Sequence, residues 1–466
     1  MKSNSKETNR IKEPSKFAIK FANTVFVLGI LFSVITSVYA VCKIYNKPEN
    51  LTSTFYYLGL LFAILTAILF VLGLRKLRDE LKVNMSVLFV TVGIVVYGFE
   101  TYLEFFHEEP QSRKEIAEQM DVPFDTRTKI EVIEDLNDFG VKAYPNVFPF
   151  LFISTNDLVA KKGRIFPLGG ISNITTVLCN ESGYYPIVET DEHGFNNPKG
   201  LYEINKVDIV LTGDSFTEGF SVYSDETISA VLRKSGFNAI SIGKGSNGSL
   251  IELAALKEYA EPLKPKIVLW VYYINDISDL GYEMESSLLR QYLNEDDFSQ
   301  NLISRQGEID SLLVDYVEVK RERENIINHQ TINVFKLFNL RTRINLTPEP
   351  EPEPEQLEIF KDILEKSKKM VSGWGGKMYF VYLPEFRRYS TGEDHINREF
   401  VLRTANELEI PIIDIHREVF VPYTDPLSLF PFRQDAHYNA DGYRLVAESI
   451  SKRLKADRII PLNLRK

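Results

Sequence analysis

Three long apolar runs lie within the first hundred or so residues of this 466-residue chain, at about 21–41, 55–74 and 85–104. Each holds about 20 residues, enough to cross a hydrocarbon layer about 30 Å thick at about 1.5 Å per helical residue. We therefore expect three transmembrane helices. The first run alone also fits a secretory signal peptide, with Val38-Tyr39-Ala40 as a cleavage site. A long basic leader before it and two further runs after it favour a membrane anchor.

The basic residues around these runs predict their orientation. Six lysines and arginines precede the first run and four fill the link between the second and third, whereas the link between the first and second holds two. Such residues stay preferentially on the cytoplasmic side. We therefore expect a multi-pass membrane protein with a cytoplasmic N-terminus, and three crossings deliver everything after about residue 106 to the extracytoplasmic side.

The remaining sequence predicts an α/β domain over 207–466. Five short apolar, β-rich runs alternate there with helical patterns. The runs are 207–212, 239–243, 267–274, 378–383 and 410–415. This alternation implies a parallel five-stranded sheet covered by helices on both faces, a three-layer flavodoxin-like fold. Ligands of such sheets bind at the carboxyl ends of the strands.

Two further segments complete the predicted organisation, after an anchor at 1–106. Residues 107–206 form an extracytoplasmic lead-in region with short β-prone pieces such as 184–189, and an insertion at about 281–356 separates the third and fourth strands. The insertion contains a charged helical stretch around 317–328. It ends in alternating proline and glutamate, which predicts an extended spacer because such a segment cannot bury apolar surface. A lid over the active face and a plain loop both fit this pattern.

Four short motifs follow the predicted strands or precede the last helix. Ser215, in Gly213-Asp-Ser-Phe, directly follows the first strand, where the N–H groups of a helix start converge. As an isolated tripeptide this is more often a helix-capping serine. The other three motifs are a glycine-rich turn at 241–250, Asn275 after the third strand, and Asp435 with His437 before a helix expected at about 441–454. His416, after the fifth strand, is a second candidate base.

The order of these motifs resembles that of the SGNH hydrolase family, a branch of the GDSL-type lipases and esterases, over roughly 207–458. The resemblance implies Ser215 as nucleophile, His437 as general base and Asp435 as the carboxylate that orients the base. Residues 190–197 (TDEHGFNN) also look like the segment that precedes the serine in membrane-bound or secreted members.

The same resemblance implies an oxyanion hole, a set of donors for the negative oxygen of the reacting ester. Its donors would be the Ser215 N–H, a glycine N–H and the Asn275 side chain. The candidate glycines are Gly243, Gly245 and Gly248.

The sequence departs from the family's pattern at two places. The family usually has Gly-x-Asn-Asp in its third motif, whereas Ile274 directly precedes Asn275 here. The family usually places the aspartate three residues before the histidine, whereas Asp435 is two residues before His437.

The resulting prediction is an anchored serine esterase that removes O-acyl groups, such as acetyl, from envelope or exported glycans through an acyl-enzyme. An O-acyltransferase with the same triad and a non-catalytic anchored binding or assembly protein are the alternatives. The expected partners are the lipid bilayer and an acylated carbohydrate or small ester. The net charge of −10 argues against nucleic-acid binding, and no cofactor or metal is expected because the sequence has no cysteine–histidine cluster.

Overall fold

The computed structural model describes residues 14–46, 52–105, 112–153, 165–204, 206–324, 354–392 and 397–459, and the single positions 334, 337 and 340. The chain divides into two compact units. The first comprises Met1–Glu108 with Asn328–Pro348, and the second comprises Glu109–Ile327 with Glu349–Lys466. Each unit is described by itself.

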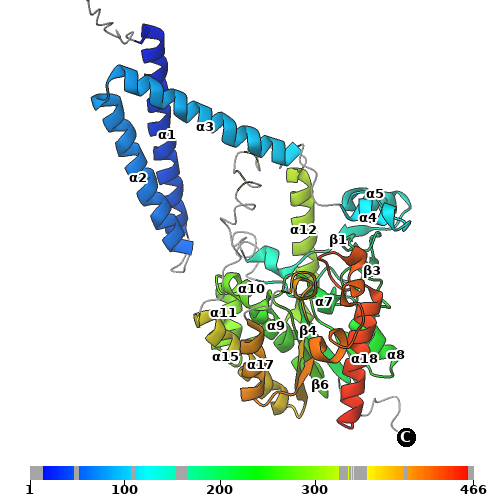
Figure 1. Ribbon diagram of the computed structural model, residues 1–466. Coiled ribbons are helices and arrows are strands. Elements are labelled where there is room, and N and C mark those ends of the chain that lie inside the picture. Colours follow the sequence, from blue (N-terminus) through cyan, green and yellow to red (C-terminus); the bar gives the residue numbers. More distant parts are fainter. Residues whose placement is uncertain are drawn as a thin grey trace, which may run out of the picture. The chain divides into compact units, whose positions relative to one another are not determined.

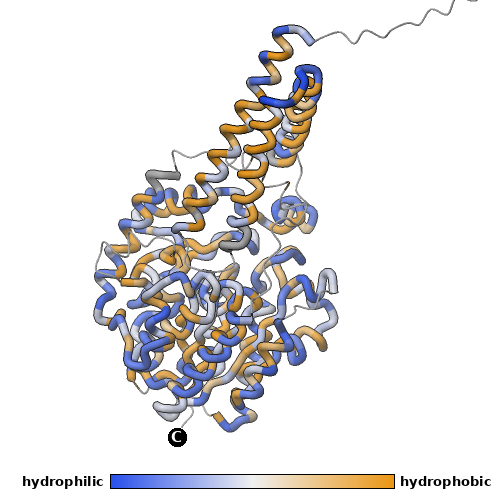
Figure 2. The backbone as a smooth tube through the Cα atoms, turned by 90° about the vertical axis from the view of Figure 1, so that its left-hand side faces the viewer, coloured by the Kyte–Doolittle hydropathy of each residue, from blue (hydrophilic) through white to orange (hydrophobic). Residues whose placement is uncertain are grey.

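The first unit contains three long helices at the expected apolar runs (Figure 1). They are α1 (Lys16–Asn46), α2 (Thr52–Lys76) and α3 (Asp79–Phe105). All three are long and apolar enough to cross a membrane. Orange, hydrophobic residues continue along these helices in Figure 2, and most of their apolar side chains are exposed rather than buried within the unit. Exposed apolar surface of this extent suits a lipid environment.

The second unit is built on one parallel sheet, as predicted. Its strands are β4 (Ile209–Gly213), β5 (Ala239–Ser241), β6 (Ile267–Tyr272), β7 (Lys377–Tyr382) and β8 (Ile412–Asp414). They lie in the order β5-β4-β6-β7-β8, and every neighbouring pair is parallel. All residues of β4 and β6 are buried, which explains why these strands are almost continuously apolar in sequence.

Helices cover both faces of this sheet (Figure 1). One face, which includes Val210 and Val268, shares a core with α9 (Ser249–Ala255), α10 (Asp276–Glu283), α15 (Pro354–Gly373) and α17 (Asn397–Glu407). The other face, which includes Ile209 and Leu269, shares a core with α8 (Ile228–Lys234) and α18 (Ala440–Ala456). Successive residues of a strand therefore point into the cores on opposite faces of the sheet. The result is the expected three-layer α/β fold.

The lead-in region packs into this same unit. It contains α4 (Arg113–Gln119), α5 (Lys129–Asp138) and a small sheet of β1 (Ala143–Pro145), β2 (Thr175–Val177) and β3 (Ile187–Glu189). Phe152, Phe166 and Phe195 are buried in the core on the Val210 face of the large sheet. Strands of three residues cannot form a stable sheet alone, so this region depends on the larger one.

Much of the expected insertion also belongs to the core. Residues 281–324 contain the end of α10, α11 (Ser287–Asn294) and α12 (Gln306–Glu324). Leu289, Tyr292 and Leu312 are buried against the helices that cover the sheet. The alternating proline and glutamate residues lie outside the described residues until α15 begins at Pro354. The described part of the segment thus contributes to the core of the second unit.

A buried carboxylate, Glu258, holds this segment in place. Its Oε1 accepts hydrogen bonds from the Tyr292 hydroxyl at 2.6 Å, the Ser299 hydroxyl at 2.9 Å and the Gln300 N–H at 2.5 Å. Its Oε2 accepts from the Leu302 N–H at 2.8 Å.

Replacing Glu258 should therefore destabilise the second unit. We expect Glu258→Ala to lower the free energy of unfolding by about 3 kcal/mol or more, because several buried donors lose their acceptor. The exposed Glu261 lies three residues further along the chain, and Glu261→Ala should change stability by about 0.5 kcal/mol or less. Denaturant unfolding of the detergent-purified full chain measures both. Equal effects of the two substitutions would contradict the structural role of residues 281–324.

Candidate active site

Ser215 lies where β4 turns sharply into α7 (Ser215–Glu218). Asp214 caps this helix, since its side chain accepts the Phe216 N–H at 2.9 Å. A Cβ at Gly213 would lie 2.1 Å from Thr217 Oγ1 and 2.8 Å from the Val271 carbonyl oxygen, so only glycine permits the turn. Because Asp214 supplies the cap, the Ser215 hydroxyl is not used for capping.

His437 lies against this hydroxyl. Its Nε2 is 2.7 Å from Ser215 Oγ, although the two residues are far apart in sequence. The rings of Phe216 and Phe220 pack on the imidazole, with centroids 4.6 and 5.1 Å away. Two residues predicted from separate motifs are thus brought into direct contact at the carboxyl end of β4.

The carboxylate that meets His437 is Glu181, in the loop between β2 and β3. Its Oε2 accepts from His437 Nδ1 at 2.8 Å, the His437 backbone N–H at 3.0 Å and the Ser221 hydroxyl at 2.5 Å. An ionised carboxylate only accepts hydrogen bonds, so we assign the imidazole proton to Nδ1 and leave Nε2 to accept from Ser215.

Two opposing effects act on the Glu181 carboxyl group. Burial raises its pKa, but the charge and hydrogen bonds of His437 and the hydrogen bond from Ser221 together outweigh burial and hold the pKa at about 2. The side chain therefore carries a full negative charge at neutral pH.

Asp435 does not occupy the position expected for it, and the structure corrects that prediction. Its side chain is 57% exposed and faces Arg387, with Oδ2 3.5 Å from Arg387 Nε. Its backbone oxygen accepts from an Arg113 N–H at 2.7 Å. The described contact of the Asp435 side chain is with Arg387, whereas the carboxylate in contact with the imidazole is that of Glu181.

The glycine turn supplies fewer free donors than expected. The Gly245 N–H donates to Glu218 Oε2 at 2.7 Å and the Gly248 N–H donates to Glu283 Oε1 at 2.7 Å. Gly243 is held more loosely, with its N–H 3.3 Å from Ser241 Oγ. It also packs closely on the nucleophile turn, because a Cβ there would lie 3.0 Å from the Asp214 oxygen. Gly243 therefore remains the glycine candidate for an oxyanion donor.

Asn275 lies just before α10, two residues after Tyr273, whose ring packs 4.3 Å from that of Phe216. One amide hydrogen of Asn275 is directed to Asp279, with an Nδ2–Oδ2 distance of 2.7 Å. An amide nitrogen carries two hydrogens, so Asn275 Nδ2 can donate to a second acceptor.

The second candidate base is engaged elsewhere. His416 Nδ1 lies 2.7 Å from the Tyr389 hydroxyl, beyond the end of β8. Burial, with Arg388 and Arg398 nearby, lowers its pKa. Among the described residues, no group of three or more His, Cys, Asp or Glu side chains is arranged to hold a metal ion.

The segment 190–197 makes hydrogen bonds to the end of α7 and to β5, beside the site. Asn196 Nδ2 donates to the Glu218 carbonyl at the end of α7, at 2.9 Å. Asn197 pairs with both backbone groups of Ser241 at 2.8 Å, as a neighbouring strand would. Asp191 in turn accepts from the Asn197 amide at 2.8 Å, and burial raises its pKa to about 6.

No family model matches the chain, and no curated protein matches its sequence. A solved lipolytic protein of the G-D-S-L family from Desulfitobacterium hafniense DCB-2 is 14% identical, with a TM-score of 0.32, over 53% of this chain and 98% of that one. An acetyl xylan esterase is 10% identical, with a TM-score of 0.32, over 53% and 100%.

A further solved structure, an α/β-hydrolase enzyme from the metagenome of Lake Arreo, Spain, is 16% identical, with a TM-score of 0.32, over 56% of this chain and 99% of that one. Similarities at this level do not assign an activity.

The pKa of Glu181 predicts a specific acid sensitivity. The carboxyl has its usual pKa near 4.5 in the unfolded chain and about 2 in the folded chain, so between these values only the unfolded chain binds the proton. Its contribution to stability is therefore full above about pH 4.5 and is lost as the pH falls to about 2. The free energy of unfolding, compared between wild type and Glu181→Gln from pH 6 to pH 2, should converge over that window. A difference that stays constant to pH 2 would contradict the ionised pair.

Proposed function

We propose that this chain is a membrane-anchored serine esterase that removes O-acyl groups, acetyl above all, from envelope or exported glycans. The observation that carries the proposal is the continuous hydrogen-bonded series from Ser215 through His437 to Glu181, at 2.7 and 2.8 Å. A hydroxyl, a base and an orienting carboxylate within hydrogen-bond reach form the arrangement that activates a serine nucleophile.

The proposed reaction begins when Ser215 Oγ attacks the ester carbonyl and His437 Nε2 takes the serine proton. The ionised Glu181 stabilises the resulting imidazolium and keeps the ring oriented. The N–H groups of Ser215 and Gly243 and the Asn275 amide would stabilise the oxyanion. The imidazolium then protonates the departing alcohol, which leaves an acyl-serine.

Water completes the cycle in the second half of the proposed reaction. His437 takes a proton from the water as its oxygen attacks the acyl carbonyl, and the serine oxygen leaves and regains that proton from the imidazolium. The products are the free sugar hydroxyl and a carboxylic acid. Every proton transfer in this scheme is assigned to a described residue, and the scheme uses no cofactor.

The setting outside the cytoplasm is inferred from the sequence. Lysines and arginines before α1 and between α2 and α3 favour a cytoplasmic location for those segments, so an odd number of crossings would export the second unit. Acylated envelope glycans are one class of ester that an anchored enzyme meets there. Three spans are few for importing an acyl donor, which favours hydrolysis over acyl transfer.

Two carboxylate substitutions test the proposed triad against the arrangement expected from sequence. The full chain in detergent should hydrolyse p-nitrophenyl acetate, and Ser215→Ala should lower kcat by roughly a thousandfold or more. Glu181→Gln should lower kcat by about a hundredfold or more, because the imidazolium loses its counter-charge and the tautomer is no longer fixed. Asp435→Asn is the matched control and should retain kcat within about threefold, since surface changes have small effects.

The opposite ranking would contradict the proposal. If Asp435→Asn abolished turnover while Glu181→Gln preserved it, Glu181 would not be the orienting carboxylate. A folded wild-type chain that turned over no acetylated sugar or small ester would remove the esterase assignment itself.

A further inference from the structure

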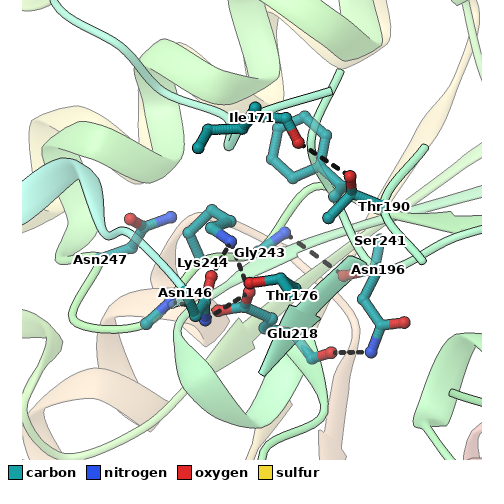
Figure 3. A network of polar contacts seen from close by, with 12 residues as sticks. Asn146, Ile171, Thr176, Thr190, Asn196, Glu218, Ser241, Gly243, Lys244 and Asn247 are labelled. Atoms are coloured by element: carbon teal, nitrogen blue, oxygen red, sulfur yellow. Dashed lines mark hydrogen bonds and ion pairs between the residues drawn. The ribbon is translucent and has the colours of Figure 1, made fainter. Parts of the chain in front are cut away.

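A buried ion pair lies beside the candidate site without belonging to the proposed triad. Lys244 and Glu218 side chains are 1% and 2% exposed, and Lys244 Nζ lies 2.5 Å from Glu218 Oε1. Asn146 joins them: its Oδ1 accepts from Lys244 Nζ at 2.7 Å and its Nδ2 donates to Glu218 Oε1 at 2.9 Å. Figure 3 shows these three side chains converging.

The members of this cluster come from three separate parts of the chain. Glu218 is the last residue of α7, the helix that begins with Ser215. Lys244 lies between Gly243 and Gly245 in the glycine turn, and Asn146 follows β1 of the lead-in region. The cluster thus links the nucleophile helix, the proposed oxyanion turn and the upstream region.

Glu218 makes this link with both of its oxygens. Oε1 receives Lys244 and Asn146, while Oε2 receives the Gly245 N–H at 2.7 Å. Because α7 has only four residues, a shift of the Glu218 side chain acts almost directly on the Ser215 turn. The same shift would release the Gly245 N–H and loosen the turn that also carries the Gly243 N–H, which itself donates to Ser241 Oγ at 3.3 Å.

We propose that Lys244, Glu218 and Asn146 form a positioning clamp that fixes the Gly243 N–H relative to Ser215 Oγ. This inference rests on the proposed esterase function, because it assigns a role to residues that touch neither substrate nor the triad. The clamp makes the lead-in region part of the catalytic geometry, since Asn146 supplies both an acceptor and a donor to the pair.

The energetics of buried ion pairs allow a positioning role of the clamp to be distinguished from a purely stabilising role. Two neutral side chains of similar size can often replace a buried ion pair at little cost in stability, whereas removing one partner leaves an uncompensated buried charge. A cavity lined in part by Asn146, Thr176, Thr190 and Lys244 adjoins the pair, so methionine at position 244 need not overpack the site. Stability and positioning can therefore be separated by single and double substitutions.

The test uses the full chain in detergent with p-nitrophenyl acetate. Lys244→Met should lower kcat by roughly tenfold to a hundredfold with little change in KM, because a small misplacement of an oxyanion donor weakens transition-state binding. In Lys244→Met with Glu218→Gln, the glutamine oxygen can still accept from the Gly245 N–H. Its amide nitrogen then replaces Oε1, to which Asn146 Nδ2 donates in the wild type, so the Asn146 amide must turn over to present Oδ1 as the acceptor. This double variant should recover most of the lost kcat.

A matched control is the exposed pair Lys361–Glu407, whose Nζ–Oε2 distance is 3.0 Å and whose side chains are 37% and 49% exposed. Lys361→Met should leave kcat, KM and melting temperature unchanged. Amide hydrogen exchange across 243–248 provides a readout that does not need turnover: exchange should be faster in Lys244→Met than in wild type, and slow again in the double variant.

Two results would overturn the clamp. One is a folded Lys244→Met chain with wild-type kcat and wild-type exchange at 243–248. The other is a double variant that regains the wild-type melting temperature without regaining kcat, which would show that geometry is not what was lost. Failure of the esterase proposal has a different signature, namely a folded wild-type chain with no turnover but with the exchange pattern intact.

Discussion

The hydrogen bond between Glu181 and His437 joins residues that are 256 positions apart. One comes from a loop of the small sheet and the other from the loop before α18, so the contact forms only when both parts are folded on the large sheet. Glu181 binds the His437 backbone N–H as well as its ring, which fixes the loop and the imidazole together. The proposed chemistry, with its base in one tautomer and facing Ser215, depends on this contact.

The sequence predicts the large sheet well because its strands are buried on both faces and are therefore continuously apolar. It also predicts the meeting of Ser215 and His437, which follow from motifs next to a strand end and a helix start. No comparable motif surrounds Glu181, because its contact with His437 forms only when segments far apart in sequence pack together. The family resemblance implies Asp435, two residues before His437, as the orienting carboxylate. Nearness along the chain does not determine what a side chain contacts, and Asp435 faces Arg387.

The glycine turn at 241–250 likewise shows how far the sequence alone can predict the site. Sequence identifies a flexible turn after the second strand of the sheet, but cannot distinguish among its N–H groups. Buried carboxylates make that distinction, since Glu218 takes the Gly245 N–H and Glu283 takes the Gly248 N–H. The upstream region supplies further support through Asn146, Asn196 and Asn197. Residues outside the four motifs thus contact and support residues within them.

The central claim is that Ser215 is an activated nucleophile, and covalent labelling tests it most directly. The full chain in detergent would be treated with a fluorophosphonate probe, and the adduct would be located by peptide mass spectrometry. We predict a single adduct on the peptide that contains Ser215, formed far more slowly in His437→Ala. A folded wild-type chain that forms no adduct at Ser215, or that reacts equally fast without His437, would contradict the account.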